Sequence, residues 1–233
     1  PANHALSTPD KPAIIMAGSG ETISYGELER RARQGAQLLR AFGLKRGDVV
    51  AMLLDNEPTV FEVAWSAQRT GLYLTSLSNK LSEADALYIL KDSGAKALVL
   101  ADRFADFGKR LADELGIPVL LATQPQHGLD SWAERRAGYP AEPTGDESPG
   151  TDMLYSSGTT GRPKGVKPSL PEGPVDVPNP LIGMAQSLWG MNADSMYLST
   201  SPLYHAAPLR WAMTAQRLGA TVVVMERFDA EQT

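Results

Sequence analysis

A regular alternation of short apolar segments and helical patterns over residues 11–122 constrains the fold more than any other feature of the sequence. Apolar residues recur at helical spacing in the longer segments, whereas aliphatic and β-branched residues fill the short ones. The expected strands are 11–16, 48–54, 72–76, 97–100 and 118–122, and the expected helices are 25–42, 56–70, 82–93 and 104–115. Strands that alternate with helices of this length indicate βαβ units. We therefore expect an α/β fold of mostly parallel sheets flanked by helices, arranged as a layered sandwich.

Residues 138–150 differ from the segments around them, because they hold three prolines, three glycines and three acidic residues. Such a composition is typical of a surface connection. Six prolines then follow between Pro163 and Pro180, and they exclude a helix and favour extended backbone. Beyond residue 150, strands are expected at 152–155, 195–200 and 220–225, and helices at 181–188 and 206–218. We predict a first α/β subdomain at 1–137, a linker at 138–152 and a second, truncated α/β segment at 153–233.

The composition limits the kinds of site that the chain can hold. It has no cysteine and three widely separated histidines, so thiolate chemistry is excluded and no metal site is predicted. The net charge is −5 with scattered Lys and Arg residues, whereas a nucleic-acid partner would require a concentrated basic face. No apolar run approaches the roughly 20 residues of a membrane-spanning helix, and the N-terminus lacks a signal-peptide pattern. These absences favour a cytoplasmic location.

The segment Tyr155–Gly165, with the sequence YSSGTTGRPKG, has the chemistry of a phosphate-binding loop. Its glycines let backbone amides approach a ligand closely, its four hydroxyl side chains add donors, and Arg162 and Lys164 add positive charge. A P-loop, G-x-x-x-x-G-K-[ST], does not fit, because Pro163 replaces the required glycine and Gly165 replaces the hydroxyl residue that binds magnesium. An ordinary surface turn would not require eleven residues in this order.

This segment resembles the phosphate-binding loop of the adenylate-forming superfamily, whose pattern is close to Y-[ST]-S-G-[ST]-T-G-x-P-K-G and is matched at every fixed position. The superfamily contains acyl- and aryl-CoA synthetases, adenylation domains of peptide synthetases, and luciferases. The resemblance implies that the chain is an incomplete N-terminal domain of the adenylate-forming fold, closest to the fatty-acyl-CoA ligases. It implies that the loop binds ATP through Ser156, Ser157, Gly158, Thr159, Thr160, Gly161 and Lys164.

A second segment, Ser201–His205, follows the expected strand 195–200 and resembles the superfamily's P-[LM]-[FY]-H motif. In that motif the aromatic residue and the histidine border the carboxylate pocket, which implies substrate-binding roles for Tyr204 and His205. The resemblance also makes His205 the candidate catalytic residue, as a donor to the substrate carboxylate or the acyl-phosphate oxygen. The alternative is a histidine that caps a helix or packs in the core. Amino-acid-activating relatives tend to carry an aspartate here, and its absence favours a fatty or aryl acid.

The sequence contains no short motif for the acyl pocket or for the rest of the active site. Helical spacing favours a core role for Trp211, Met213 and Met184 over a place in an acyl pocket. The superfamily's later motifs are an aromatic-Gly-x-Thr-Glu segment near adenine and magnesium, an aspartate for the ribose, and a C-terminal lysine. None occurs before Thr233. We therefore expect most Mg²⁺ ligands to lie outside this chain, and we predict that the chain alone does not catalyse adenylation.

The resemblance implies an ATP-dependent acyl-CoA synthetase, which is an AMP-forming acid–thiol ligase. Such an enzyme activates a fatty or related carboxylic acid as acyl-AMP and transfers it to CoA, and it uses ATP, Mg²⁺ and CoA. Two alternatives stay open: another adenylate-forming enzyme, either a carrier-protein acyl-AMP ligase or a luciferase-like oxidase, and a nucleotide-binding protein without turnover. No nucleic-acid partner or transmembrane segment is expected, while peripheral membrane association and a homodimer stay open.

Overall fold

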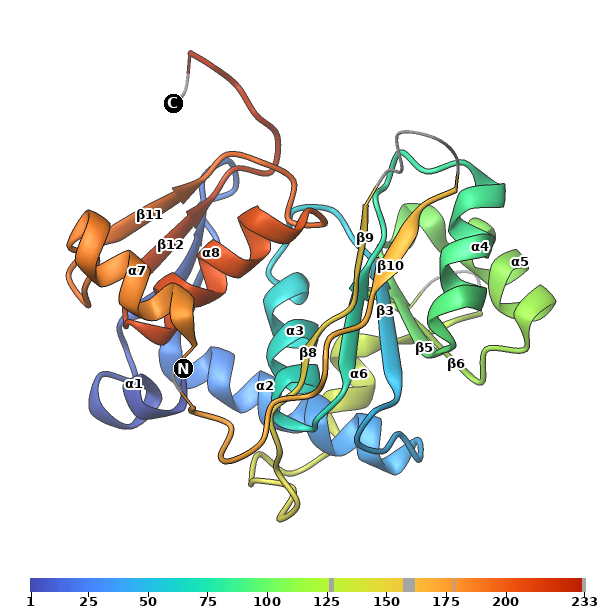
Figure 1. Cartoon of the computed structure of the whole chain (residues 1–233), viewed down its shortest axis with the longest axis horizontal. Coiled ribbons are helices and arrows are strands. Elements are labelled where there is room, and N and C mark those ends of the chain that lie inside the picture. The colour runs from blue at the N-terminus through green and yellow to red at the C-terminus, as the bar shows by residue number, and fades with distance from the viewer. Residues whose placement is uncertain (126–127, 157–161, 178, 232–233) are drawn as a thin grey trace. The chain divides into compact units, whose positions relative to one another are not determined.

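The computed structural model describes residues 1–125, 128–156, 162–177 and 179–231 (Figure 1). The chain divides into two compact units, each with its own main sheet. Unit 1 comprises Pro1–Arg31, Asp55–Phe61 and Pro178–Thr233, and unit 2 comprises Ala32–Leu54 and Glu62–Val177. The predicted linker 138–152 lies within unit 2.

Unit 2 is built on a six-stranded, all-parallel sheet with the strand order β7-β6-β5-β3-β4-β8. The strands are β3 (Val49–Leu53), β4 (Tyr73–Ser76), β5 (Ala95–Leu100), β6 (Val119–Ala122), β7 (Asp130–Ser131) and β8 (Thr151–Asp152). All five residues of β3 are apolar and buried, which is typical of a central strand in a parallel sheet that is covered on both faces.

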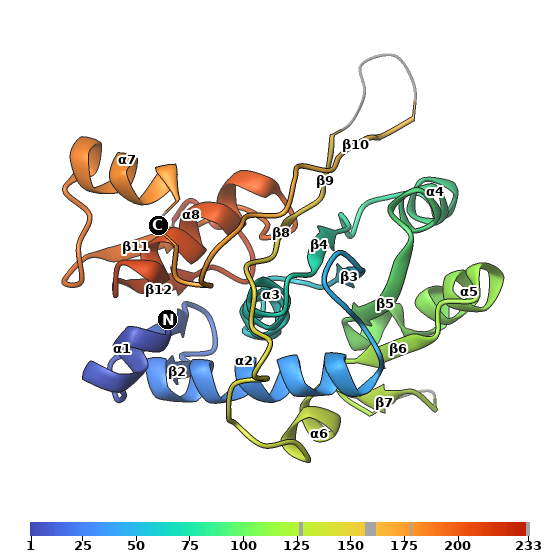
Figure 2. The ribbon, with the colours of Figure 1, turned by 60° about the horizontal axis from the view of Figure 1, so that its bottom comes forward.

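Helices α4 (Glu83–Ser93) and α5 (Ala105–Leu115), with the 3₁₀ turn η1 (Asp102–Phe104), lie on the same side of this sheet (Figure 2). Leu90 of α4 and Leu111 of α5 join buried residues of β3 and β5 in one apolar cluster. Burial of aliphatic side chains of this size contributes about 1.5–3 kcal/mol each, so this cluster is a main source of stability in unit 2.

The helix starts that the sequence predicts are confirmed at two positions. In front of α2 (Tyr25–Ala41), the Ser24 hydroxyl accepts from the Glu27 amide at 3.2 Å, and in front of α4 the Ser82 hydroxyl accepts from the amide three residues on at 3.1 Å. The Glu27 carboxylate pairs with two guanidinium groups one turn further along α2, those of Arg30 and Arg31.

A buried ion pair joins α3 (Thr59–Arg69) to α6 (Trp132–Ala137) in unit 2. The Glu62 carboxylate accepts from Nε1 of Trp132 at 3.1 Å and from Nε of Arg136 at 2.9 Å. The Glu62 and Arg136 side chains are only 3% and 7% exposed. The sequence pattern did not predict α6 or the preceding β7. The contacts with Glu62 hold α6, and β7 is held by its pairing with β6.

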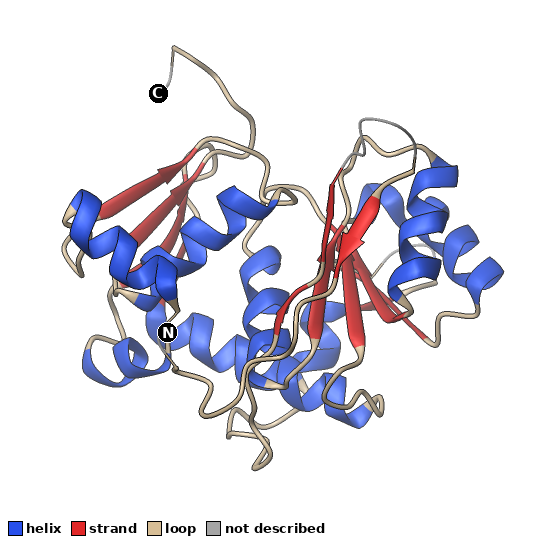
Figure 3. Ribbon diagram, viewed as in Figure 1, coloured by secondary structure: helices blue, strands red, loops and turns tan. Residues whose placement is uncertain are grey.

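Unit 1 contains a four-stranded sheet with the order β11-β12-β1-β2 (Figure 3). Strand β1 (Pro12–Met16) pairs in parallel with β12 (Thr221–Val224) and antiparallel with β2 (Thr22–Ser24), and β11 (Met196–Ser199) extends the sheet beyond β12. The Tyr25 hydroxyl donates to the Ala220 carbonyl at 2.7 Å, and this bond reinforces the pairing of β1 with β12.

The described helices that lie wholly within unit 1 are α1 (Ala2–Ser7), α7 (Pro180–Trp189) and α8 (Ala206–Arg217). Trp189 and Trp211 meet edge to face with ring centroids 5.1 Å apart, and this contact packs α7 on α8. Within the ranges that the structure describes, no helix has the length and apolar character needed to cross a membrane. The predicted fold class, mostly parallel sheets flanked by helices, is confirmed.

Candidate functional site

The glycine-rich segment is carried by a two-stranded antiparallel hairpin in unit 2. Its arms are β9 (Leu154–Ser156) and β10 (Lys164–Val166), and Lys164 lies directly opposite Ser156 at the end nearest the connecting loop. Among the predicted ATP-binding residues, the structure describes these two. The others lie outside the described residues: Ser157, Gly158, Thr159, Thr160 and Gly161.

Positive charge at the end of this hairpin is accessible to a ligand. Lys164 and Arg162 are both exposed, and the Lys164 ammonium makes no ion pair or hydrogen bond with any described residue. The Arg162 guanidinium lies 5.4 Å from the centroid of the Tyr88 ring on α4. A lysine and a serine that face each other in the ladder, next to a glycine-rich segment, suit the oxygens of a polyphosphate, so these residues fit ATP.

The first and last residues of the predicted motif contact each other across the hairpin. Tyr155 pairs with Gly165 in the ladder, and a Cβ atom added at Gly165 would lie 2.7 Å from Cζ of the tyrosine ring. The Tyr155 hydroxyl donates to the Asp92 carboxylate at 2.6 Å. Burial raises the pKa of Tyr155, and the hydrogen bond to Asp92 raises this pKa further, so the phenol stays protonated and continues to donate.

Both arms of the hairpin continue into segments that are fastened to the large sheet. On the incoming side the Thr75 hydroxyl of β4 donates to the Met153 carbonyl at 3.1 Å. On the outgoing side the Tyr73 hydroxyl donates to the Pro168 carbonyl at 2.7 Å, and the Lys167 ammonium lies 4.7 Å from the Tyr73 ring centroid. Strand β4 therefore fixes the chain before and after the hairpin.

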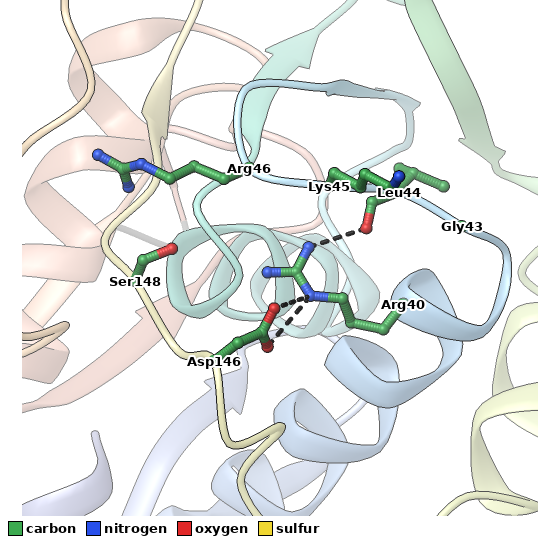
Figure 4. Close-up of a pocket in the computed structure, with 7 residues that line it drawn as sticks. All are labelled: Arg40, Gly43, Leu44, Lys45, Arg46, Asp146 and Ser148. Atoms are coloured by element: carbon green, nitrogen blue, oxygen red, sulfur yellow. Dashed lines mark hydrogen bonds and ion pairs between the residues drawn. The ribbon is translucent and has the colours of Figure 1, made fainter.

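A surface cavity of about 600 Å³ lies near the same segments in unit 2 (Figure 4). It is lined by Arg40, Gly43, Leu44, Lys45, Arg46, Asp146 and Ser148. Its two guanidinium groups are occupied by protein oxygens. Arg40 pairs with Asp146 at 3.0 Å and donates to the Leu44 carbonyl at 2.8 Å, and Arg46 donates to the Pro149 and Pro171 carbonyls at 3.1 and 2.9 Å. These arginines fasten the connections on either side of the hairpin.

The second predicted segment lies in unit 1, where Tyr204 and His205 precede α8. His205 occupies the N-cap position of this helix, but its side chain makes no capping hydrogen bond, so the alternative role as a capping histidine is not supported. The imidazole is exposed and lies against the Tyr204 ring, with ring centroids 4.5 Å apart. Its nitrogens are therefore accessible to a ligand.

Asn56 holds the chain that leads to this histidine, and sequence reasoning assigned it only to the start of a helix. Its Oδ1 accepts from the Leu203 amide at 2.8 Å, while its Nδ2 donates to the Met225 carbonyl at 2.8 Å and to the Ser201 carbonyl at 3.3 Å. One side chain thus joins the end of β12 to the Ser201–His205 segment. A polar residue just after a buried strand was the signal that could have drawn attention to it.

The predicted core role of three large residues holds for one of them and fails for another. Met213 is 6% exposed and belongs to the core, and Trp211 is half-buried against Trp189. Met184 is 42% exposed on α7, so its assignment to the core is wrong. Helical spacing marks it as apolar but does not tell which face of a short helix is covered.

The sequence matches the family model of AMP-binding enzymes over residues 2–233, and the chain belongs to that family. Its recognition as an adenylate-forming protein is thereby confirmed. It is 31% identical to a 3-hydroxybenzoate–CoA ligase of Aromatoleum sp. (strain CIB), over 92% of this chain and 41% of that enzyme. It is 28% identical to the long-chain-fatty-acid–CoA ligase FadD13 of Mycobacterium tuberculosis, over 97% of this chain and 44% of that enzyme.

A solved structure of similar fold is also known. ATP-bound MatB from Rhodopseudomonas palustris matches with a TM-score of 0.80 at 25% identity, over 97% of this chain and 44% of that chain. The chain therefore spans less than half the length of the curated relatives described here and of this structure.

Proposed function

We propose that the protein to which this chain belongs is an AMP-forming acid–thiol ligase that activates a fatty or aryl carboxylic acid and transfers the acyl group to CoA. The observation that carries the proposal is the pairing of β9 with β10, which places an exposed Lys164 opposite Ser156 at the two ends of the glycine-rich segment. Both curated relatives described above are CoA ligases, and CoA is the acceptor in this proposal.

The reaction takes place in two displacements. In the first, a carboxylate oxygen attacks the α-phosphorus of ATP, the bond between the α- and β-phosphates breaks, and pyrophosphate leaves with the electron pair. In the second, the CoA thiol gives up its proton to solvent and its sulfur attacks the acyl carbonyl, and the bond from that carbon to the phosphate oxygen breaks so that AMP leaves with the electron pair. Each step builds negative charge on a departing phosphate, so positioned donors and cations lower the barrier.

The chain's own hairpin residues act on the departing pyrophosphate. Thr159, Thr160 and Lys164 hold the β- and γ-phosphates in this proposal, and Ser156, Ser157 and the amides of Gly158 and Gly161 complete the cradle. Lys164 is suited to this role because its ammonium has no partner among the described residues. Mg²⁺ would neutralise the phosphate oxygens further, with most of its ligands outside this chain.

The segment in unit 1 acts on the other substrate. His205 donates a hydrogen bond to the substrate carboxylate or to the acyl-phosphate oxygen, and Tyr204 borders the carboxylate pocket. The exposed imidazole and its contact with the Tyr204 ring support these roles. Ala206 and Ala207 follow where amino-acid-activating relatives tend to carry an aspartate, so an acid without an ammonium group is favoured.

A carboxylate-dependent exchange of pyrophosphate into ATP tests the proposal in the complete gene product. Exchange is expected with a fatty or an aryl acid and not with an amino acid. Lys164→Ala should lower it about ten- to hundredfold, the loss of one charge-assisted hydrogen bond of roughly 1.5–3 kcal/mol. Lys109→Ala is the matched control, because Lys109 is an exposed lysine on α5.

The possible results separate the parts of the proposal. Absence of exchange with every carboxylate would overturn the ligase function, and exchange that Lys164→Ala leaves unchanged would overturn the role of the hairpin lysine. The 233-residue chain alone should show no exchange, since the adenine, ribose and lysine motifs are not among its residues.

A further inference from the structure

We propose that Asp92 is a positioning residue that docks the phosphate-binding hairpin on helix α4 through Tyr155, an inference that rests on the proposed function for the hairpin's role. Asp92 lies outside both segments that the sequence marks as functional. It contacts the reacting groups in neither step, and it acts through the arm of the hairpin that carries Ser156. The contact that defines it is the 2.6 Å hydrogen bond from the Tyr155 hydroxyl to the carboxylate.

The place of Asp92 on its helix is electrostatically unfavourable. It lies in the last turn of α4, two residues before the left-handed Gly94 that ends the helix. The carbonyl groups at a helix C-terminus carry a partial negative charge, so an aspartate there is disfavoured relative to a neutral residue. Asp92 therefore adds nothing to the stability of α4 itself, and the hydrogen bond from Tyr155 gives the carboxylate a partner.

Helix α4 contacts both arms of the hairpin with one face. Tyr88 and Asp92 are four residues apart, so their side chains lie on the same side of the helix. Asp92 accepts from Tyr155 on β9, and Tyr88 lies under the guanidinium of Arg162, which precedes β10. Two contacts from one helix face thus restrain the two ends that flank the glycine-rich loop.

The hairpin depends on such contacts because its own strands are short and poorly covered. Each arm has three residues, and all three residues of β10 are exposed. A two-stranded hairpin is marginally stable by itself in water. Gly165 contributes by leaving space for the Tyr155 ring over β10, which places the hydroxyl within reach of Asp92.

Hydrogen exchange of the 233-residue chain tests the docking directly. Asp92→Ala and Tyr155→Phe should each raise the exchange rate of the β9 and β10 amides about three- to tenfold, because each removes one hydrogen bond that restrains the hairpin. Asp92→Asn keeps an acceptor and should restore most of the protection. Asp113→Ala is the matched control, since Asp113 is an exposed aspartate in the last turn of α5, which also ends at a left-handed glycine.

Kinetics of the complete gene product test the positioning role. Asp92→Ala should raise the KM for ATP about three- to tenfold and leave the KM for the carboxylate unchanged, with Asp92→Asn close to the parent enzyme. Unchanged exchange at β9 and β10 would overturn the docking. Faster exchange with an unchanged KM for ATP would overturn the positioning role. If the parent protein shows no pyrophosphate exchange with any carboxylate, the proposed function fails, and the amide exchange rates still decide the docking.

Discussion

The ring of Tyr155 lies over Gly165, its partner across the β9–β10 ladder, so closely that a side chain at residue 165 would displace the ring. The two residues are the first and last of the glycine-rich motif. A position can require glycine because its backbone has a positive φ or because a neighbouring group leaves no room for a Cβ atom. At Gly165 the second reason applies. The same contact directs the tyrosine hydroxyl toward Asp92.

Gly165→Ala should destabilise the hairpin. The new Cβ would lie 2.7 Å from Cζ of Tyr155, and relief of that clash moves the ring away from Asp92. Overpacking of this kind costs about 1–3 kcal/mol, which urea denaturation monitored by circular dichroism would measure. Gly183→Ala is the control, because Gly183 lies within α7 with open space around it, and alanine there should stabilise the helix by about 0.5–1 kcal/mol. A neutral effect of Gly165→Ala would contradict the steric argument.

Substitution of the buried Glu62 should lower the free energy of unfolding more than Gly165→Ala does. Glu62→Ala removes the carboxylate that pairs with the buried Arg136 guanidinium, and it removes the acceptor of the Trp132 indole. We expect a loss of about 3–5 kcal/mol in the free energy of unfolding. The double variant Glu62→Leu with Arg136→Met removes both charges and should recover most of that loss, as measured by urea denaturation. A double variant no more stable than Glu62→Ala would show that the charges are not the cause.

The strand–helix alternation sufficed to predict the strands β3 to β6 and the helices between them, because each is long enough to show its periodicity. Strand β7, helix α6 and strand β10 were missed for a different reason. Helix α6 has six residues and is fixed by the contacts of Trp132 and Arg136 with Glu62, 70 and 74 residues away in sequence. Strand β10 is exposed and contains Lys164 and Gly165, so only its pairing with β9 makes it a strand.

The residues of the candidate site also fall into two groups, those that the sequence predicts and those that only the fold reveals. The motif itself predicts Lys164 and Ser156 as binding residues, since the residue types and their order can be seen within a short segment. The supporting residues Asp92 and Asn56 were not identified, because each acts on a segment 63 or more residues away and neither belongs to a local pattern. Support of this kind is set by the tertiary fold, which periodicity does not specify.

Asn56→Ala should loosen the segment that leads to His205. The substitution removes the acceptor of the Leu203 amide and the donor to the Met225 carbonyl, each of which joins Asn56 at 2.8 Å. Removing the hydrogen-bond partner of the partly buried Leu203 amide costs about 1–3 kcal/mol. Hydrogen exchange should accelerate at Leu203 and its neighbours, and urea denaturation should show the loss. Asn3→Ala, an exposed change in α1, should do neither, and equal effects of the two changes would contradict the assigned role of Asn56.

The pairing of Glu27 with its neighbours predicts a dependence of stability on pH. Hydrogen bonds from Arg30, at 2.6 and 2.7 Å, and then from Arg31 lower the pKa of Glu27 from 4.5 to about 2. Because the pKa is lower in the folded state, the carboxylate contributes stability above pH 4.5, and this contribution is lost as the pH falls toward 2.

Glu27→Gln should therefore lower the free energy of unfolding at pH 7 by a few tenths of a kcal/mol to about 1 kcal/mol, since the group is partly exposed and solvent screens the pairs. Urea denaturation of the parent and the variant at several pH values should show this difference shrink between pH 4.5 and about 2. Glu114→Gln, at an exposed carboxylate of α5, should show no comparable difference. A Glu27→Gln difference that persists unchanged at pH 2 would mean that packing, rather than charge, accounts for the effect of this residue.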